Sequence, residues 1–293
     1  MTRTALTSIL LFSLVSVVSA QDEGKKKTIA YVQKLQTSTG GFVSMMGPNI
    51  RVQPTLRATS SAVRALHYLG GEIPDKAACI KFVESCHHAE SGGFADTPNG
   101  KPDVFTTAVG IMAVTELGMS TDKYGKGAVG NLDRHAATFD EIRIAVAGLE
   151  RIKTIASNKE GWLRETAKGM KRNGTFGDGA GVARETASRV VTLLRLGEKA
   201  TLPDIVIKTL DEGQRKDGGW GKAEDAAVSD LETTYRVMRC YMMLKAHPRN
   251  ADAVHAFVAK CRNDDGGYGL VPGQPSSVNS TYFAAIVTHW LKK

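Results

Sequence analysis

Four arginines recur at similar places in the chain, and their side chains are suited to binding anions. They are Arg64, Arg143, Arg189 and Arg236, and each lies inside a segment with helical apolar spacing. A guanidinium group presents its N–H donors as a planar fork that binds a carboxylate or a diphosphate in bidentate fashion. The recurrence predicts an anion site if the fold turns these four side chains toward one another.

Two of the arginines also have a simpler explanation as partners in helical ion pairs. Glu185 and Glu232 precede Arg189 and Arg236 by four residues, and such pairs stabilise a helix by about 0.2–0.5 kcal/mol. We favour the ion pair for these two. Arg64 has no acidic residue four positions before it, so it is the stronger candidate for a ligand contact.

The elements that must position the arginines are marked by a recurring Gly-Gly-aromatic phrase. It reads Gly40-Gly41-Phe42, Gly92-Gly93-Phe94, Gly174-Thr175-Phe176, Gly218-Gly219-Trp220 and Gly266-Gly267-Tyr268. Glycine commonly ends a helix because it adopts the left-handed conformation without a Cβ clash. A phrase that returns at a regular spacing indicates repeated units, none of which can bury its apolar face alone.

Each phrase stands between two segments in which apolar residues recur at i, i+3, i+4 and i+7. This spacing predicts amphipathic helices rather than strands. The first segments are 26–35, 75–86, 158–170, 202–212 and 251–261, and the second are 57–68, 103–117, 139–152, 184–196, 230–244 and 279–291. Between residues 120 and 138, glycines leave room for only a short first helix. Counting this degenerate repeat predicts six helix pairs.

Two stretches carry a resemblance to a known family. Residues 214–221 read Gln-Arg-Lys-Asp-Gly-Gly-Trp-Gly and precede Asp230-Leu231-Glu232-Thr233-Thr234-Tyr235, while residues 90–98 read Glu-Ser-Gly-Gly-Phe-Ala-Asp-Thr-Pro. They resemble the repeat shared by protein prenyltransferase β subunits and squalene or terpenoid cyclases, and the second stretch is especially similar to the geranylgeranyl transferase β subunit. The resemblance implies an all-α protein, an α/α toroid of six helix-pair repeats whose second helices form an inner barrel around a central cavity.

The resemblance also indicates which positions would carry chemistry. In the transferases an Asp and a Cys two residues apart, with a His from another repeat, hold a zinc ion. Here Asp230 matches the Asp, Glu232 stands at the Cys position and Thr106 at the His position. Thiolate and imidazole ligands favour zinc, whereas these side chains offer only oxygens. We therefore expect no metal site, and zinc only if the chain is an active transferase.

Further positions follow from the same resemblance. The position of Glu232 faces the cavity in the family, so Arg236, one helical turn later, is expected on the same side. Tyr235 is a candidate for the cavity wall, or else a core aromatic. Lys222 stands near the basic residue that the transferases use for the diphosphate, or else is a solvent-exposed loop lysine.

The first twenty residues have the pattern of a secretory signal peptide. Arg3 precedes an apolar run over residues 5–18, and small residues at 18–20 suit a signal peptidase. We predict a signal peptide over residues 1–20 and a single toroid domain over 21–293, located outside the cell or in the periplasm. No later segment is apolar enough to span a membrane.

Charge and cysteine content give weaker indications. The formal charge is +8, but the basic residues form no stripe interleaved with aromatics, so we expect no nucleic-acid partner. The four cysteines, Cys79, Cys86, Cys240 and Cys261, contain no CxxC motif. Either Cys240 pairs with Cys261 or all four are buried free thiols.

The sequence leaves three functional hypotheses. In the first, a toroid without zinc binds an unknown apolar, anionic or peptide ligand in its central cavity. In the second, it is a scaffold whose cavity is filled by side chains. In the third, it is a divergent active prenyltransferase or terpenoid cyclase acting on isoprenoid substrates. Export favours the first two, because isoprenyl diphosphates are intracellular.

Overall fold

The computed structural model describes residues 22–47, 52–222 and 228–292, and within these ranges nearly all of the regular secondary structure is helical. A first helix covers residues 22–34. The others are α2 (Leu56–Leu69), α3 (Lys76–Ser85), α4 (Val104–Glu116), α5 (Thr121–His135), α6 (Phe139–Arg151), α7 (Lys159–Ala167), α8 (Val182–Arg195), α9 (Pro203–Glu212), α10 (Leu231–Met243), α11 (Ala251–Lys260) and α12 (Val278–Leu291). A short hairpin pairs β1 (His87–His88) with β2 (Gly93–Phe94), and a 3-10 turn, η1 (Gly179–Gly181), precedes α8.

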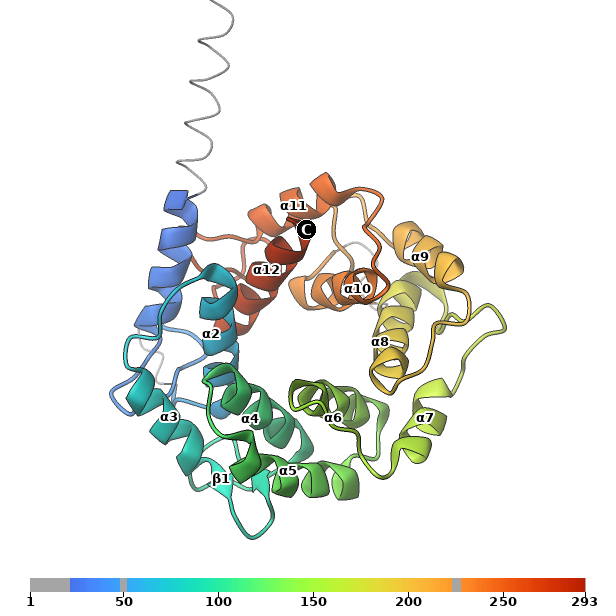
Figure 1. The fold of residues 1–293 in the computed structure, drawn as a ribbon. Helices are drawn as coiled ribbons and strands as arrows, with labels where there is room; N and C mark the ends of the chain where they lie inside the picture. Colours follow the sequence, from blue (N-terminus) through green and yellow to red (C-terminus); the bar gives the residue numbers. More distant parts are fainter. Residues whose placement is uncertain (1–21, 48–51, 223–227, 293) are drawn as a thin grey trace, which may run out of the picture.

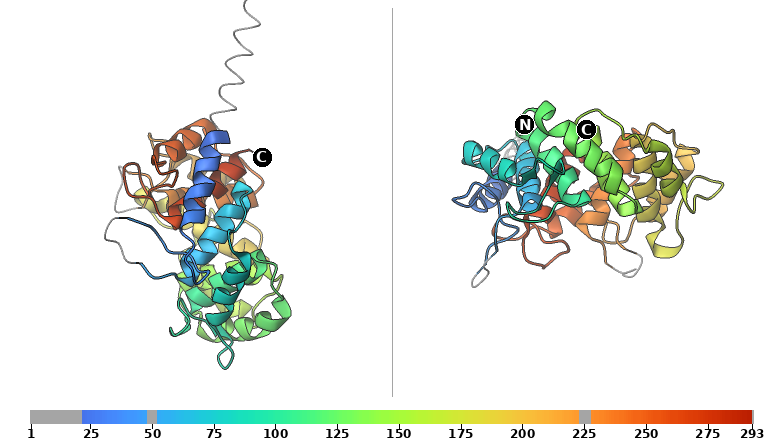
Figure 2. Two further views of the ribbon diagram at one scale, coloured as in Figure 1. Left: turned by 90° about the vertical axis from the view of Figure 1, so that its left-hand side faces the viewer. Right: turned by 90° about the horizontal axis from the view of Figure 1, so that it is seen from below.

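The helices form two concentric rings (Figure 1). On the inner ring α2, α4, α6, α8, α10 and α12 pack against one another in chain order, and α12 packs against α2. The helix over residues 22–34 and α3, α5, α7, α9 and α11 lie outside them. The predicted fold, an all-α toroid of six helix-pair repeats, is confirmed. Seen edge-on in Figure 2, the double ring is flatter than it is wide.

The outer ring closes where the last repeat meets the first helix. Nη2 of Arg262 donates to the carbonyl oxygen of Gly24 over 2.7 Å. A Cβ added to Gly266 would lie only 2.6 Å from the carbonyl oxygen of Lys27. The turn of the last repeat therefore packs directly on the backbone of the helix over residues 22–34, and the array is a closed ring rather than an open stack.

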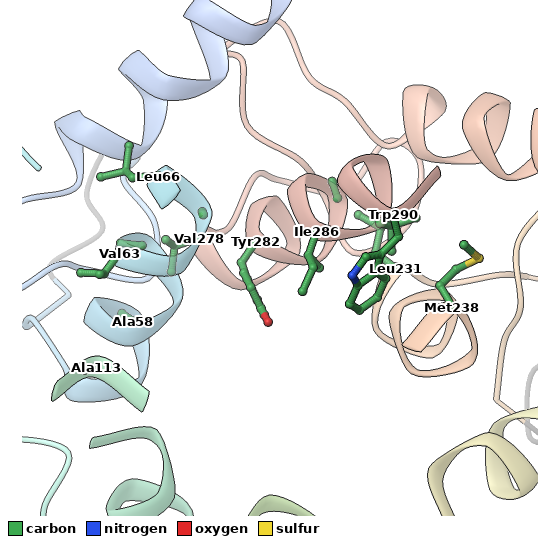
Figure 3. Packing of buried hydrophobic residues seen from close by; sticks show 14 of the residues in the cluster. Ala58, Val63, Leu66, Ala113, Leu231, Met238, Val278, Tyr282, Ile286 and Trp290 are labelled. Carbon is green, nitrogen blue, oxygen red and sulfur yellow. The ribbon is translucent and has the colours of Figure 1, made fainter. Parts of the chain in front are cut away.

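The inner seam between α2, α12 and α10 shows how the repeats share one core. Val63 and Leu66 on α2 and Ile286 on α12 are at most 2 % exposed. Figure 3 shows them with Leu231 of α10 in the same apolar layer. Burial of such side chains stabilises by about 25 cal/mol per Å² of apolar surface, so each inner helix is held by the apolar sides of its neighbours.

The glycine phrases lie in the turns that follow the outer helices, and not at the helix ends where they were expected, because α3, α9 and α11 already end in right-handed caps at Cys86, Gly213 and Cys261. The first glycine of each phrase is left-handed, with φ of 87° at Gly40, 68° at Gly92, 79° at Gly174, 100° at Gly218 and 88° at Gly266. The second glycine has a different role, which the sequence did not indicate. A Cβ on Gly219 would lie 2.8 Å from the ring of Phe257, so a missing side chain there lets the next outer helix pack closely.

A repeated hydrogen bond fixes each phrase to the inner helix that follows it. The backbone N–H of the aromatic residue donates to a threonine hydroxyl near the start of that helix. The pairs are Phe42 with Thr59 (2.9 Å), Phe94 with Thr107 (3.0 Å), Phe176 with Thr186 (3.0 Å), Trp220 with Thr234 (3.2 Å) and Tyr268 with Thr281 (3.1 Å). The threonines therefore set the position of each inner helix relative to the outer one.

Replacing one of these threonines should measurably destabilise the ring. We expect Thr186→Val to lower the free energy of unfolding by about 1–3 kcal/mol, because it leaves the buried amide of Phe176 without its acceptor. Thr209→Val is the matched control, since the Thr209 hydroxyl bonds only to the carbonyl of Ile205 within its own helix. Urea unfolding of both variants tests this. Equal losses would show that the bond to Phe176 has no special role.

The degenerate third repeat differs from the prediction. The sequence predicted a short first helix between residues 120 and 138, but α5 runs over 15 residues. Its glycines do not break the helix. A Cβ on Gly127 would lie 2.9 Å from the Cα of Gly92, so this glycine lets α5 approach the turn of the preceding repeat. Close packing between elements has outweighed the low helix propensity of glycine.

Three further predictions concern the signal peptide, membrane-spanning segments and the state of the cysteines. The proposed signal peptide, residues 1–20, lies outside the described residues. Across the ranges that are described, no helix combines the length and apolar character needed to cross a bilayer. All four cysteines are buried free thiols, which is one of the two alternatives considered. Burial raises the pKa of each thiol to about 12.

Candidate functional site

The inner ring surrounds a central cavity of about 680 Å³, including the part that opens to solvent. Five inner helices line it. The lining residues are Arg64 and Tyr68 from α2, Met112 from α4, Arg143, Ile144, Ala147, Glu150 and Arg151 from α6, Ser188, Val191 and Arg195 from α8, and Tyr235, Arg236 and Arg239 from α10. Of this space, about 90 Å³ is open to the centre of a water molecule, which is room for several water molecules.

The lining is strongly basic. Among the described residues that line the cavity, six are arginines and one, Glu150, is a carboxylate. The positive groups come from four different helices, so the excess charge is a property of the ring and not of one segment. Low-dielectric walls focus such a field, because solvent cannot screen it as it does at an open surface.

Four of these arginines are paired with carboxylates. The pairs are Arg236 with Glu232 (2.5 Å), Arg195 with Glu150 (2.9 Å), Arg151 with Glu116 (2.7 Å) and Arg143 with Asp140 (3.3 Å). Glu232 also accepts from Arg184 over 3.3 Å. Burial alone would raise the pKa of Glu232, but Arg236 and Arg184 outweigh it and lower that pKa.

Arg64 has no carboxylate partner among the described residues. Its Nη2 donates to the hydroxyl of Tyr282, its Nη1 lies 3.4 Å from the sulfur of Met112, and its guanidinium carbon is 4.2 Å from the centre of the Tyr282 ring. Figure 3 shows the Tyr282 hydroxyl directed from α12 toward the space inside the ring. The charge of Arg64 is therefore held by neutral groups alone.

Arg239 is the second arginine without a carboxylate among the described ion pairs. Its Nη2 is 3.2 Å from the hydroxyl of Tyr235, and its guanidinium carbon lies 4.7 Å from the centre of the Trp290 ring. Its Nε is buried and has no hydrogen-bond partner in the described part of the chain, and neither has the hydroxyl of Ser188 on the same cavity wall. Both polar groups are therefore buried in the cavity wall without a partner in the described part of the chain.

Burial and repulsion from a neighbouring arginine both lower the pKa of two cavity arginines, Arg143 and Arg195. Burial lowers the pKa of Arg143 to about 10, and the charge of Arg236 acts in the same direction. Burial lowers the pKa of Arg195 as well, and Arg239 adds to that effect. Both shifts mean that the charged form is disfavoured by its surroundings. An anion between these groups would remove that cost.

The structure brings most of the predicted ligand residues together. Arg64, Arg143, Arg236 and Tyr235 line the cavity. Lys222 does not, because its side chain is exposed at the turn before α10.

Arg189 lies away from the cavity lining. Its Nε pairs with Glu185 over 2.5 Å. Its Nη1 donates to the carbonyl oxygens of Glu165 (3.2 Å) and Thr166 (2.9 Å) at the end of α7. The guanidinium also covers the ring of Phe139 at 4.1 Å. Arg189 therefore links α8 to the neighbouring outer helix.

The positions expected to replace zinc ligands serve the local backbone or pair with arginine. Asp230 caps α10, with one carboxylate oxygen 2.8 Å from the amide of Thr233 and the other 2.8 Å from its hydroxyl. Thr106 is fully buried and donates to the carbonyl of Phe94 over 2.6 Å. Within the described ranges no three His, Cys, Asp or Glu side chains gather where they could hold a metal ion. The residues present do not fit a zinc site.

Sequence reasoning missed Arg239, Arg195, Arg151 and Ser188. A signal was present for Arg239, which follows Tyr235 by four residues and so lies on the same face of α10. Arg195 similarly follows the cavity-lining Val191 by four residues. The four-residue spacing identifies further cavity-lining residues on a helix, but only when one residue of that helix is already known to face the cavity.

Comparison with known proteins places this geometry in a family. A family model described as the prenyltransferase alpha-alpha toroid domain matches residues 3–87, 63–134 and 142–292. The chain matches no curated protein sequence.

Three solved structures share the fold at low sequence identity. Protein geranylgeranyltransferase-I from Candida albicans, solved with GGPP, is 11 % identical with a TM-score of 0.61, covering 80 % of this chain and 83 % of the other. The type II terpene cyclase MstE from Scytonema, in its apo form, is 12 % identical with a TM-score of 0.60, covering 92 % and 96 %. A protein described as a wild-type glycosidase gives the same four values. These likenesses show the fold alone, whereas the family model matches most of the sequence: the chain belongs to the prenyltransferase alpha-alpha toroid domain family.

Proposed function

We propose that this chain is an exported toroid that binds an organic anion in its central cavity and lacks a catalytic zinc site. The observation that carries the proposal is the pair Arg64 and Arg239, two cations on the cavity wall without a carboxylate partner among the described residues. Charges removed from water are normally paired. Here the missing negative charge is supplied by the ligand.

The apolar part of the wall defines the rest of the ligand. Met112, Ile144, Ala147 and Val191 lie between the arginines in the cavity lining. A small inorganic anion would leave these side chains without a contact. An amphipathic anion, such as a fatty carboxylate, satisfies both the guanidinium groups and the apolar surface.

Calorimetric titration of the purified chain tests the proposal. Decanoate and geranyl diphosphate serve as amphipathic anions, and decyltrimethylammonium serves as a cation with the same apolar tail as decanoate. We expect the anions to bind, with an affinity that weakens as salt is added, and the cation not to bind. Failure of both anions, or equal binding of the cation, would contradict the proposal.

The absence of a catalytic zinc site is a separate prediction. We expect metal analysis of the purified chain to find no stoichiometric zinc, because Asp230 is used as a helix cap and Glu232 is held by Arg236 and Arg184. A chain that retained one zinc per molecule through dialysis would contradict this. It would revive the alternative function, a divergent active prenyltransferase or terpenoid cyclase.

That alternative has one observation in its favour, since an arginine-rich cavity suits a diphosphate as well as a carboxylate. It differs from simple binding in what happens to the ligand. Incubation of the chain with geranyl diphosphate, followed by product analysis, separates the two. Recovery of unchanged diphosphate supports binding alone, and release of inorganic diphosphate or formation of a cyclic product supports an enzyme.

A further inference from the structure

The two arginines without carboxylates converge on a pair of tyrosine hydroxyls. Arg239 donates to the Tyr235 oxygen over 3.2 Å, and Arg64 donates to the Tyr282 hydroxyl. The rings of Tyr235 and Tyr282 lie next to each other, with centres 5.8 Å apart. The Tyr235 oxygen therefore accepts a guanidinium donor from α10, and the second guanidinium group is held by the neighbouring tyrosine of α12.

The Tyr235 ring is held rigidly in this position. It stacks on Phe283 with centres 5.0 Å apart and on Trp290 with centres 5.8 Å apart. Because both flanking rings come from α12, Tyr235 cannot turn its hydroxyl away from the arginines without breaking the seam between α10 and α12. The Tyr235 oxygen is thus held close to the positively charged arginines of the cavity wall.

Groups from every neighbouring inner helix except α4 act on this oxygen or on its partners. The titratable and charged groups around it are Arg64 and Tyr68 of α2, Arg143 and Glu150 of α6, Arg195 of α8, Arg236 and Arg239 of α10, and Tyr282 and His289 of α12. Glu150 is already bound by Arg195. The phenols of Tyr235 and Tyr282 are the acids that remain beside Arg64 and Arg239, and Tyr235 is the one that accepts from Arg239.

We propose that Tyr235 is the internal counter-ion of the cavity: its phenol gives up its proton to solvent when the cavity holds no anion, and takes one back when an anion binds. This rests on the proposed function, because it requires that an anion and the phenolate compete for the same guanidinium groups. Ligand binding is then accompanied by uptake of one proton, and the anion replaces the phenolate as the partner of Arg64 and Arg239.

The acidity of the pair agrees with this arrangement. Burial alone would raise the pKa of Tyr235, but the charges of Arg239, Arg64 and Arg195 outweigh it and lower that pKa well below the ordinary value. Burial raises the pKa of its partner Tyr282. The arginine charges therefore act on Tyr235 in the direction that favours its ionised form. A bound carboxylate would place a like charge beside the phenolate and favour its protonated form.

The sign of the pH dependence follows directly. Below the pKa of Tyr235 the phenol is neutral and both guanidinium groups are available, so an anion binds most tightly there. As the pH rises through that pKa, the affinity falls by about tenfold per pH unit, because one proton must be taken up for each anion bound. A carboxylate is the suitable probe, since it is fully ionised across this range.

Two measurements on the full chain test the proposal. The first is a pH titration without ligand, followed by the near-ultraviolet absorbance of tyrosinate, on wild type and Tyr235→Phe. We expect one tyrosine of the wild type to ionise well below pH 9, and this step to be missing in Tyr235→Phe. Tyr31→Phe is the matched control: burial raises the pKa of Tyr31, so its removal should leave the early step unchanged.

The second measurement is calorimetric titration with decanoate at several pH values and in buffers of different ionisation enthalpy. We expect uptake of about one proton per decanoate by the wild type above the Tyr235 pKa, and an affinity independent of pH in Tyr235→Phe. His289→Asn should keep the pH dependence of the wild type, which excludes the imidazole as its source.

The outcomes distinguish this proposal from the function on which it rests. Decanoate binding without proton uptake, or proton uptake that disappears in His289→Asn instead of Tyr235→Phe, would overturn the counter-ion and leave the anion site standing. An early tyrosine ionisation that Tyr235→Phe removes, together with no anion binding, would support the counter-ion and overturn the proposed function. Absence of the early ionisation in the wild type would overturn the counter-ion outright.

Discussion

A double variant in which Arg64 and Arg239 are both replaced by methionine should lose anion binding without any loss in the stability of the ring. Each guanidinium group offers a charge-assisted hydrogen bond worth about 1.5–3 kcal/mol, so each single variant should weaken decanoate binding by roughly tenfold to a hundredfold. Calorimetric titration of the two single variants and of the double variant measures the loss. Methionine keeps most of the apolar stem, so packing against Met112 and Trp290 is largely retained.

The stability of these variants gives an independent readout. Neither arginine has a carboxylate partner among the described residues, and the Arg239 Nε has no hydrogen-bond partner there. Removing their charges relieves repulsion within the cavity, and Tyr235 takes back its proton once the two guanidinium groups are gone. We therefore expect the free energy of unfolding without ligand to stay level or rise. Arg57→Met is the matched control, because Arg57 is a half-exposed surface residue bound to Asp103. It should leave decanoate binding unchanged.

A double variant that still bound decanoate with wild-type affinity would contradict the anion site. A double variant that lost several kcal/mol of stability would show instead that Arg64 and Arg239 serve the fold. The combination of lost binding and retained stability is the signature of groups held in place for a ligand, because such groups are costly to the empty protein.

Gly218→Ala should cause the largest loss of stability of any single glycine change in the repeat turns. The backbone at Gly218 has φ of 100°, and an added Cβ would lie 2.0 Å from the carbonyl oxygen of Ala253 on α11. The left-handed conformation costs an alanine about 1–2 kcal/mol. The overlap with backbone must also push the turn away from α11, which adds about 1–3 kcal/mol. We expect a total loss of roughly 2–5 kcal/mol in urea unfolding.

Gly273→Ala separates the two contributions. Gly273 has φ of 81°, and a Cβ there would meet no atom within 4 Å. Its replacement should therefore cost only the conformational part, about 1–2 kcal/mol. If both variants lost the same free energy, contact between the turn and the next outer helix would not be a constraint on the repeat. Gly218→Ala should also weaken decanoate binding, because the displaced turn is bonded to α10 through the amide of Trp220 and the hydroxyl of Thr234.

The fold was predictable because the residues that begin its helices and form its turns have recognisable sequence signals. Left-handed glycines such as Gly40 and Gly266 form the turns that follow outer helices, and caps such as Asp103 and Asp230 begin inner ones. These signals act locally, so they can be recognised without knowledge of the fold. The length of α5 was not predictable in the same way. Gly127 is tolerated there because it packs against Gly92, a contact between residues far apart in the chain.

The candidate site was predicted less completely, for a geometric reason. Arg189 seemed equivalent to Arg236 because both follow a glutamate by four residues. On α8, however, the inward residues are Ser188, Val191 and Arg195. One residue along a helix turns the side chain by about 100°, so Arg189 faces the outer ring although Ser188 faces the cavity. The rotation of each helix is set by its packing, which local sequence patterns do not contain.

The most direct test of the anion site is a crystal structure of the chain grown with a brominated decanoate, whose bromine gives an anomalous signal. The account predicts a carboxylate inside the inner ring, within hydrogen-bond distance of the Arg239 Nε and next to Arg64, with the bromine among Ile144, Ala147 and Val191. A ligand bound only on the outer surface, or one lying in the cavity with its carboxylate away from both arginines, would contradict it.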